Sequence, residues 1–176
     1  MKKIEYRLAT EKDFEELYKR MERDFPYEER RDKIAQRALL SRDDVKWYVF
    51  TENGSFISYI SVWEYPNTVF IEHFAVNSEM RGNGYGTLTL KKLLDFYKDK
   101  KVVLEVEPPI EDYPKKRVEF YKKNGFMLNE SLFYEQPSYH GEGALTLNLM
   151  SYPTLLTEDE ASEFKKNTLN TAYKRI

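Results

Sequence analysis

Hydrophobic residues in the first part of the chain recur at helical spacing in two places. Residues 11–24 predict a helix with one buried face, formed by Phe14, Leu17, Tyr18 and Met21. Residues 27–44 predict a second helix with Ile34, Ala38 and Leu39 inward, and its many charges are expected to form a solvated face. Residues 3–10, before both, alternate as a strand does. The chain is therefore predicted to begin with a strand and two helices.

The next stretch, residues 45–77, has the composition and alternation of strands. Two runs rich in aromatic and β-branched residues flank Asn53-Gly54, a pair typical of a two-residue type I′ hairpin turn. A turn at residues 66–68 leads into the apolar run VFIEHFAVN, residues 69–77. These patterns predict an antiparallel meander of three strands.

The second half of the chain alternates between helical and strand patterns. Residues 84–98, 113–125 and 157–174 predict helices, the last opened by a capping box of Thr157 and Glu160. Residues 101–107, 126–135 and 144–150 predict strands. The whole order, β-α-α-β-β-β-α-β-α-β-β-α, predicts an α/β fold with a mixed, mostly antiparallel central sheet and flanking helices. Residues 1–150 are expected to form one domain, and residues 151–176 a helical extension packed on it or at a dimer interface.

Composition narrows the function classes. The chain of 176 residues is 41% hydrophobic and 33% charged, a globular balance. Its 28 basic and 30 acidic residues include no basic stretch that would predict a nucleic-acid partner. The absence of cysteine excludes disulfides, thiolate zinc sites and cysteine nucleophiles, and two histidines argue against a histidine-rich metal site, so no metal is expected. Without a signal peptide or a long apolar run, the sequence predicts a cytoplasmic protein with no membrane partner.

Three of the seven glycines, Gly82, Gly84 and Gly86, fall within five residues between a predicted strand and a predicted helix. Such a turn presents backbone N–H groups at the positive end of a helix dipole and can bind an anion, while glycine permits positive φ and close approach. Arg81 at the mouth of the turn would add a charge-assisted contact to a phosphate. A P-loop requires Lys-Ser or Lys-Thr directly after its last glycine, and neither pair follows here. A Rossmann turn requires a third glycine at the position that Thr87 occupies.

Two motifs point to a known family. Residues 81–86, RGNGYG, fit the pattern R/Q-x-x-G-x-G/A, and residues 117–126, RVEFYKKNGF, contain a matching FYxKxGF segment one crossover later. With the meander before them, they resemble the GCN5-related N-acetyltransferase (GNAT) superfamily over most of residues 6–150. The resemblance implies an acyl-CoA N-acyltransferase fold, splayed between the central strands, that moves an acetyl group from acetyl-CoA to a primary amine. The alternative is a catalytically idle acyl-CoA-binding or sensor module.

The resemblance also implies which residues hold the cofactor. The backbone at Phe74, Ala75 and Val76 would pair with the pantetheine arm of acetyl-CoA. The pyrophosphate would lie on the turn formed by Arg81, Gly82, Asn83, Gly84, Tyr85, Gly86 and Thr87. Tyr121 matches the tyrosine that protonates the departing thiolate in many members, and a core aromatic is its alternative role.

The general base is less closely specified. Glu72 interrupts an apolar strand and matches a glutamate of some polyamine-acetylating relatives, so it is the first candidate. A structural salt bridge and a substrate-holding carboxylate are the alternatives for Glu72, and His73, Glu105 or a water relay are the alternatives for the base. The expected partner is a small-molecule or peptide amine, and a homodimer through the terminal helix is possible. Acidic residues near the expected cleft weakly favour a cationic amine.

Overall fold

The computed structural model describes residues 2–141 and 143–174. Residues 1, 142, 175 and 176, which the predicted domain ranges include, lie outside the described residues. The elements follow the predicted order: β1 (Glu5–Leu8), α1 (Phe14–Asp24), α2 (Lys33–Ala38), β2 (Val45–Glu52), β3 (Ser55–Glu64), β4 (Thr68–Val76), α3 (Tyr85–Phe96), β5 (Lys101–Val106), α4 (Asp112–Lys123), β6 (Met127–Pro137), β7 (Ala144–Tyr152) and α5 (Glu158–Asn170). Short 3₁₀ turns lie at Glu11–Asp13, Tyr27–Glu29, Leu39–Ser41 and Ser78–Met80.

Across the described residues, seven strands form one sheet in the order β1-β2-β3-β4-β5-β7-β6. The pairs β1/β2, β2/β3, β5/β7 and β6/β7 are antiparallel. The prediction of an α/β fold with a mostly antiparallel sheet and flanking helices is confirmed. The chain divides into two compact units: unit 1 is Met1–Glu64 with Ile71–Phe96, and unit 2 is Tyr65–Phe70 with Tyr97–Ile176. In the described residues, no helix has both the length and the apolar character needed to cross a membrane.

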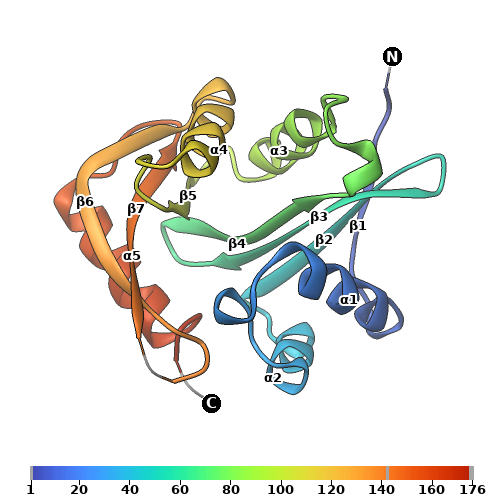
Figure 1. Ribbon diagram of the computed structural model, residues 1–176, viewed down its shortest axis with the longest axis horizontal. Coiled ribbons are helices and arrows are strands. Elements are labelled where there is room, and N and C mark those ends of the chain that lie inside the picture. Colours follow the sequence, from blue (N-terminus) through green and yellow to red (C-terminus); the bar gives the residue numbers. More distant parts are fainter. Residues whose placement is uncertain (1, 142, 175–176) are drawn as a thin grey trace. The chain divides into compact units, whose positions relative to one another are not determined.

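Unit 1 is built on the β2–β3 hairpin. Asn53 and Gly54 have φ angles of 50° and 79°, the two positive values that the predicted type I′ turn requires. In Figure 1, α1 and α2 lie on one face of the strands of this unit and α3 lies on the other. The buried ring of Phe14 on α1 packs edge-on against Trp47 of β2 at 6.3 Å, so the helix face predicted from spacing is the one that is buried.

The second predicted helix is wrong in length and in its buried face. Only Lys33–Ala38 is α-helical, and Ile34 is 86% exposed. Arg31, just before the helix, and Gln36, within it, are buried instead, while Leu39 is buried as predicted. Arg31 is buried because its guanidinium donates to a buried carboxylate of β4, and Gln36 accepts a hydrogen bond from the same guanidinium. The charges of this segment therefore do not all form a solvated face.

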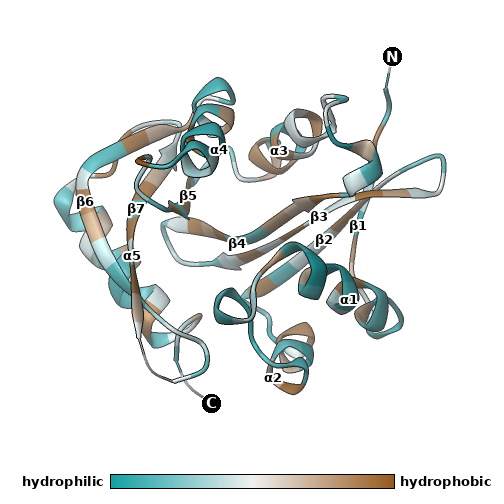
Figure 2. Cartoon of the chain, viewed as in Figure 1, coloured by the Kyte–Doolittle hydropathy of each residue, from teal (hydrophilic) through white to brown (hydrophobic). Residues whose placement is uncertain are grey.

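Unit 2 packs helices on a short strand that is apolar on both faces. Val102, Val103 and Leu104 are successive buried residues of β5, which indicates that both faces of this strand are covered. Phe164 of α5 is buried and meets the ring of Phe70 edge-on at 5.4 Å. The predicted capping box of Thr157 and Glu160 is present at the start of α5. Figure 2 shows the resulting mixture of hydrophobic bands on β5 and β7 and hydrophilic residues over much of α4.

Candidate functional site

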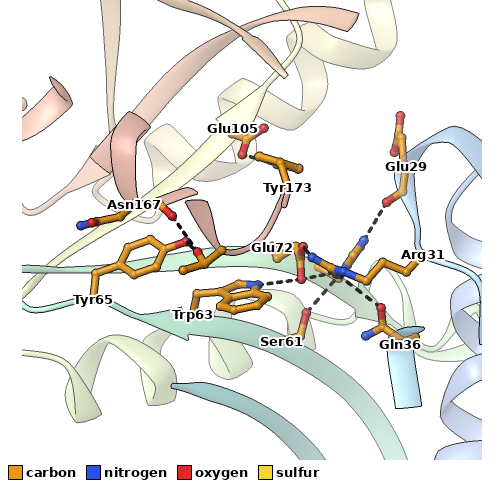
Figure 3. Close-up of polar contacts among 12 residues, drawn as sticks. Glu29, Arg31, Gln36, Ser61, Trp63, Tyr65, Glu72, Glu105, Asn167 and Tyr173 are labelled. Atoms are coloured by element: carbon orange, nitrogen blue, oxygen red, sulfur yellow. Dashed lines mark hydrogen bonds and ion pairs between the residues drawn. The ribbon is translucent and has the colours of Figure 1, made fainter. Parts of the chain in front are cut away.

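Glu72 lies in the middle of β4 within a buried polar group of unit 1. Its side chain is 1% exposed, and Oε1 accepts a hydrogen bond of 2.7 Å from Nη2 of Arg31, itself 8% exposed. Oε2 accepts a hydrogen bond of 3.0 Å from the indole Nε1 of Trp63 on β3 (Figure 3). A buried carboxylate needs such donors to offset its desolvation. Arg31 and Trp63 together hold Glu72 in one orientation and, through Arg31, balance its charge.

His73, the neighbour of Glu72, belongs to the same polar group. Its Nε2 lies 2.8 Å from the main-chain oxygen of Glu29, which can only accept, so Nε2 carries a proton. Its Nδ1 lies 3.4 Å from the Ser61 hydroxyl and 3.7 Å from Oε2 of Glu72. Through His73, β4 is tied to the segment between α1 and α2, on which Arg31 also lies.

The glycine turn has the geometry that an anion site needs. Gly82 and Gly84 have φ angles of 77° and 80°, a region that other residues rarely adopt. An added Cβ would meet nothing within 4 Å at either position, so the backbone conformation, and not crowding, calls for glycine. Gly86 is already in the first turn of α3, where Leu88 N–H bonds the Gly84 carbonyl at 3.2 Å. The turn therefore leads directly into the N-terminus of α3, as predicted.

The side chains of the turn bind mainly to the chain itself. Arg81 donates from Nε to the Val76 carbonyl at 3.0 Å and from Nη2 to Asp24 at 3.1 Å. Asn83 donates from Nδ2 to the Arg81 carbonyl at 3.1 Å. Thr87, the last predicted phosphate contact, is exposed in the first turn of α3. Arg81 thus fixes the turn to the end of β4.

Tyr85 closes the turn on its other side. Its ring is buried, and its hydroxyl donates a hydrogen bond to Glu52 at the end of β2. This hydrogen bond, with a smaller effect of burial, raises the pKa of Tyr85. The tyrosine therefore anchors the start of α3 to the β2–β3 hairpin.

The strand end predicted to contact pantetheine leads into the turn. Ala75 is buried in the core of unit 1, whereas Phe74 and Val76 are half-buried, as alternation along a strand requires. Asn77 N–H bonds the Ile57 carbonyl at 2.8 Å and so continues the β3–β4 pairing to the turn. Phe74, Ala75, Val76 and the glycine turn are thus continuous within unit 1.

Tyr121 lies in unit 2, on the buried face of α4 with Pro114 and Val118. Its ring is 3% exposed and contacts Phe120 at 5.2 Å and Phe126 at 5.6 Å between centroids. Its main-chain oxygen accepts from Phe126 N–H at 3.1 Å, at the Asn124-Gly125 helix end that the sequence predicts. The motif residue is therefore firmly packed.

Glu105 is the remaining predicted candidate, and His140 is the second histidine of the chain. Glu105 lies on β5 of unit 2, and its Oε1 accepts a hydrogen bond of 2.5 Å from the Tyr173 hydroxyl (Figure 3). His140 lies in the loop between β6 and β7, where its main-chain N–H bonds the Ser138 hydroxyl at 3.2 Å.

Sequence reasoning missed Arg31 and Tyr173. Arg31 stands in the run EERRDK, residues 28–33, where a solvated face is the natural expectation. Its partner is 41 residues away along the chain. The available signal was Glu72 itself, because a carboxylate in an apolar strand requires a donor from some other element.

Comparison with known proteins decides the family. The model of the acetyltransferase (GNAT) family matches residues 12–126, which include β4, the glycine turn and Tyr121. The chain belongs to this family. A curated relative, "Putative acetyltransferase YjbC" of Bacillus subtilis, is 30% identical over 155 residues, 86% of this chain and 78% of the relative.

Solved structures of this GNAT protein's relatives agree. A "Putative acetyltransferase from GNAT family" of Bacteroides thetaiotaomicron is 32% identical with a TM-score of 0.86, over 96% of this chain and 98% of that one. NAA60 of Arabidopsis thaliana, solved with acetyl-CoA, has the same fold, with a TM-score of 0.65 and 15% identity over 85% and 98% of the two chains. Membership of the family indicates an acetyl-CoA-dependent N-acetyltransferase.

Proposed function

We propose that this GNAT protein transfers the acetyl group of acetyl-CoA directly to a primary amine, with a carboxylate base and a tyrosine acid. The amine nitrogen attacks the thioester carbonyl carbon, the C–S bond breaks, the ammonium proton passes to the protein, and the CoA thiolate takes a proton. The observation that carries the proposal is the β4–turn–α3 segment: a strand leads into two positive-φ glycines at a helix N-terminus, inside the matched family segment.

This segment is proposed to bind acetyl-CoA along its length. Backbone groups of Phe74, Ala75 and Val76 would pair with the pantetheine amides, where the resemblance implies that the central strands splay. The N–H groups from Arg81 to Thr87 would hold the pyrophosphate. In support, the side chains of Arg81 and Tyr85 bind Val76, Asp24 and Glu52, and so fix the turn before any ligand arrives.

Tyr121 is proposed as the acid. Its phenol would donate a proton to the thiolate as the C–S bond breaks. Support comes from its place in the FY motif and from the rigid packing of its ring between Phe120 and Phe126, which would fix the hydroxyl.

Glu72 is proposed as the carboxylate base, with a substrate-holding carboxylate and a structural salt bridge as its alternative roles. Its contacts with Arg31 and Trp63 hold the carboxylate in one orientation, which each of these roles needs. Each carboxylate oxygen has more than one lone pair, so the contacts to Arg31 and Trp63 leave acceptor capacity. His73, Glu105 and a water relay stay open as bases.

The competing function is an idle acyl-CoA-binding module. An ion-paired Glu72 and a core-packed Tyr121 are also what such a module would have. The two functions differ in turnover alone. The cytoplasmic location, the homodimer and the division at residue 150 stay predictions.

The deciding experiment combines calorimetry with an activity screen. The purified protein is titrated with acetyl-CoA and then assayed for thiol release against a library of small amines and peptide N-termini. Binding heat together with release above the hydrolysis background for at least one amine is expected. Binding without release across the library would favour the idle module, and no binding heat would overturn both functions.

A further inference from the structure

The last residue of α1 is an acid in an electrostatically unfavourable place. Asp24 ends the helix, and its side chain is only 8% exposed. The C-terminus of a helix carries a partial negative charge, so a carboxylate there is destabilised unless a cation lies close to it. The loss of water around a buried carboxylate adds to this cost. Asp24 therefore needs a cation from a neighbouring part of the chain.

The glycine turn supplies that cation. Nη2 of Arg81 donates to Oδ1 of Asp24 at 3.1 Å, although the two residues are 57 positions apart in the sequence. The guanidinium of Arg23, within α1, is farther away, with its Nε 3.7 Å from the same oxygen. The buried phenol of Tyr59 on β3 also lies near the carboxylate: burial and then the negative charge of Asp24 raise the pKa of Tyr59. Asp24 thus joins the turn to the packed core of unit 1.

The guanidinium of Arg81 is held by two acceptors from different elements. Its Nε donates to the Val76 carbonyl at the end of β4 at 3.0 Å, and its Nη2 donates to Asp24. Two such contacts on a planar group fix the orientation of its plane. They leave further N–H groups on both terminal nitrogens, and the side chain is 56% exposed, so an anion on the turn can reach these groups.

We propose that Asp24 is a positioning residue for acetyl-CoA, which fixes the guanidinium of Arg81 in the orientation that meets the pyrophosphate on the glycine turn. The inference rests on the proposed function, whose cofactor site it extends to α1. Asp24 acts through Arg81 and does not itself contact the cofactor. Asp24, Arg81 and the turn all belong to unit 1.

The sign of the effect separates positioning from charge alone. A carboxylate near a phosphate repels it, so the loss of its charge would by itself tighten acetyl-CoA binding. If Asp24 holds Arg81, Asp24→Asn should instead raise the Kd of acetyl-CoA by about threefold to fivefold, a modest factor because Arg81 is half exposed. At saturating acetyl-CoA, kcat should stay within about twofold, because Arg81 is proposed to bind only the phosphates. Calorimetry and steady-state kinetics measure the two quantities.

A truncated cofactor tests whether the effect passes through the pyrophosphate. The acetyl thioester of pantetheine lacks the pyrophosphate and the nucleotide, so its kcat/KM should be the same for the wild type and Asp24→Asn. Glu16→Gln is the matched control, because it removes another carboxylate of α1, one that pairs with Arg20 of the same helix at 2.8 Å. It should change neither the Kd of acetyl-CoA nor the kcat/KM of the truncated thioester.

A second variant changes the exposed partner in place of the buried one. Arg81→Lys keeps the positive charge but lacks the planar fork that binds Val76 and Asp24 together. It should raise the Kd of acetyl-CoA at least as much as Asp24→Asn does. Adding Asp24→Asn to Arg81→Lys should then cost nothing more, because Asp24 has no other route to the cofactor.

Three results would overturn the inference. They are unchanged or tighter acetyl-CoA binding by Asp24→Asn, an equal loss with the pantetheine thioester, and additive losses in the double variant. Absence of acetyl-CoA binding by the wild-type protein would instead overturn the proposed function and this inference together.

Discussion

At the residue scale, one oxygen atom separates the two roles of Tyr121. Tyr121→Phe keeps the ring between Phe120 and Phe126 and removes only the hydroxyl. If the phenol protonates the thiolate, kcat should fall more than about tenfold, while the Kd of acetyl-CoA changes by no more than about threefold. Steady-state kinetics and calorimetry measure the two quantities.

A matched control is available for this variant. Tyr152 contacts Phe126 at 5.6 Å, the same ring distance as Tyr121, so Tyr152→Phe removes a hydroxyl from the same aromatic cluster. It should leave kcat within about twofold. Equal losses in the two variants would show that Tyr121 is a packing residue.

Glu72 makes a prediction about stability as well as catalysis. Glu72→Gln leaves the guanidinium of Arg31 buried without its counter-charge, so the free energy of unfolding should fall by about 3–5 kcal/mol. Removing the cation as well, in Glu72→Gln with Arg31→Met, should restore part of this loss, because the partners are coupled. Urea unfolding of the wild type, both single variants and the double variant measures the coupling.

The same variant tests the base. If Glu72 accepts the proton, Glu72→Gln should lose the rise of kcat/KM with pH that deprotonation of a general base produces. An unchanged pH profile in a folded variant would leave Glu72 as a structural partner of Arg31 and move the base elsewhere.

At the element scale, the sequence predicted correctly those features that depend on neighbouring residues. The hairpin turn at Asn53-Gly54, the glycine turn and the capping box of α5 each depend on a few neighbouring residues, and all three were found. The buried face of α2 depends on Glu72, far along the chain, and was wrong. The contact between Tyr173 and Glu105, 68 residues apart, was missed for the same reason. The spacing of residues along the chain predicts which side chains share a face of a helix. It does not predict which polar side chain will be buried against a partner from a distant part of the sequence.

The glycine turn gives the first prediction at this scale. Gly84→Ala forces a Cβ onto a φ of 80° and should lower the free energy of unfolding by about 1–2 kcal/mol. It should also weaken acetyl-CoA binding, because strain shifts the N–H groups. Gly86→Ala, inside α3, is the control, and it should raise stability by about 0.5–1 kcal/mol. Equal destabilisation by both variants would contradict the role of the positive φ at Gly84.

The start of α1 gives a prediction about pH. The Arg7 guanidinium bonds both carboxylate oxygens of Asp13 at 2.7 Å, and this contact, with Thr10 N–H at 2.7 Å, lowers the pKa of Asp13 well below its usual range. A lowered folded-state pKa adds stability above the unfolded pKa of about 4 and loses it as the pH falls further.

Asp13→Asn should therefore cost about 1 kcal/mol at neutral pH, a modest loss because Arg7 is half exposed. The difference from the wild type should shrink steadily below about pH 4. Urea unfolding between pH 7 and pH 2.5 checks this, with Asp95→Asn, at an exposed position on α3, as the control. A difference independent of pH would mean that the carboxylate charge contributes nothing.

At the scale of the whole molecule, β4 links the two compact units. Thr68–Phe70 fall in unit 2, and Ile71–Val76 in unit 1. The proposed cofactor segment lies in unit 1, whereas Tyr121 and Glu105 lie in unit 2. The pattern of alternating helices and strands predicted the order of the elements. It does not predict that the boundary between two compact units falls within a continuous strand. The division into units therefore came from the structure alone.

The last prediction concerns the response of the whole protein to its cofactor. A ligand that binds only the folded chain stabilises it by mass action, so acetyl-CoA at about 100 times its Kd should add about 2.7 kcal/mol to the free energy of unfolding. The increase in Tm should follow the logarithm of the acetyl-CoA concentration. ATP is the matched control, because residues 81–87 lack the lysine and the spacing of a nucleotide-binding loop. Equal increases in Tm with ATP and acetyl-CoA would mean that the turn selects phosphate alone, and no increase with either would contradict the assignment of the turn as a cofactor site.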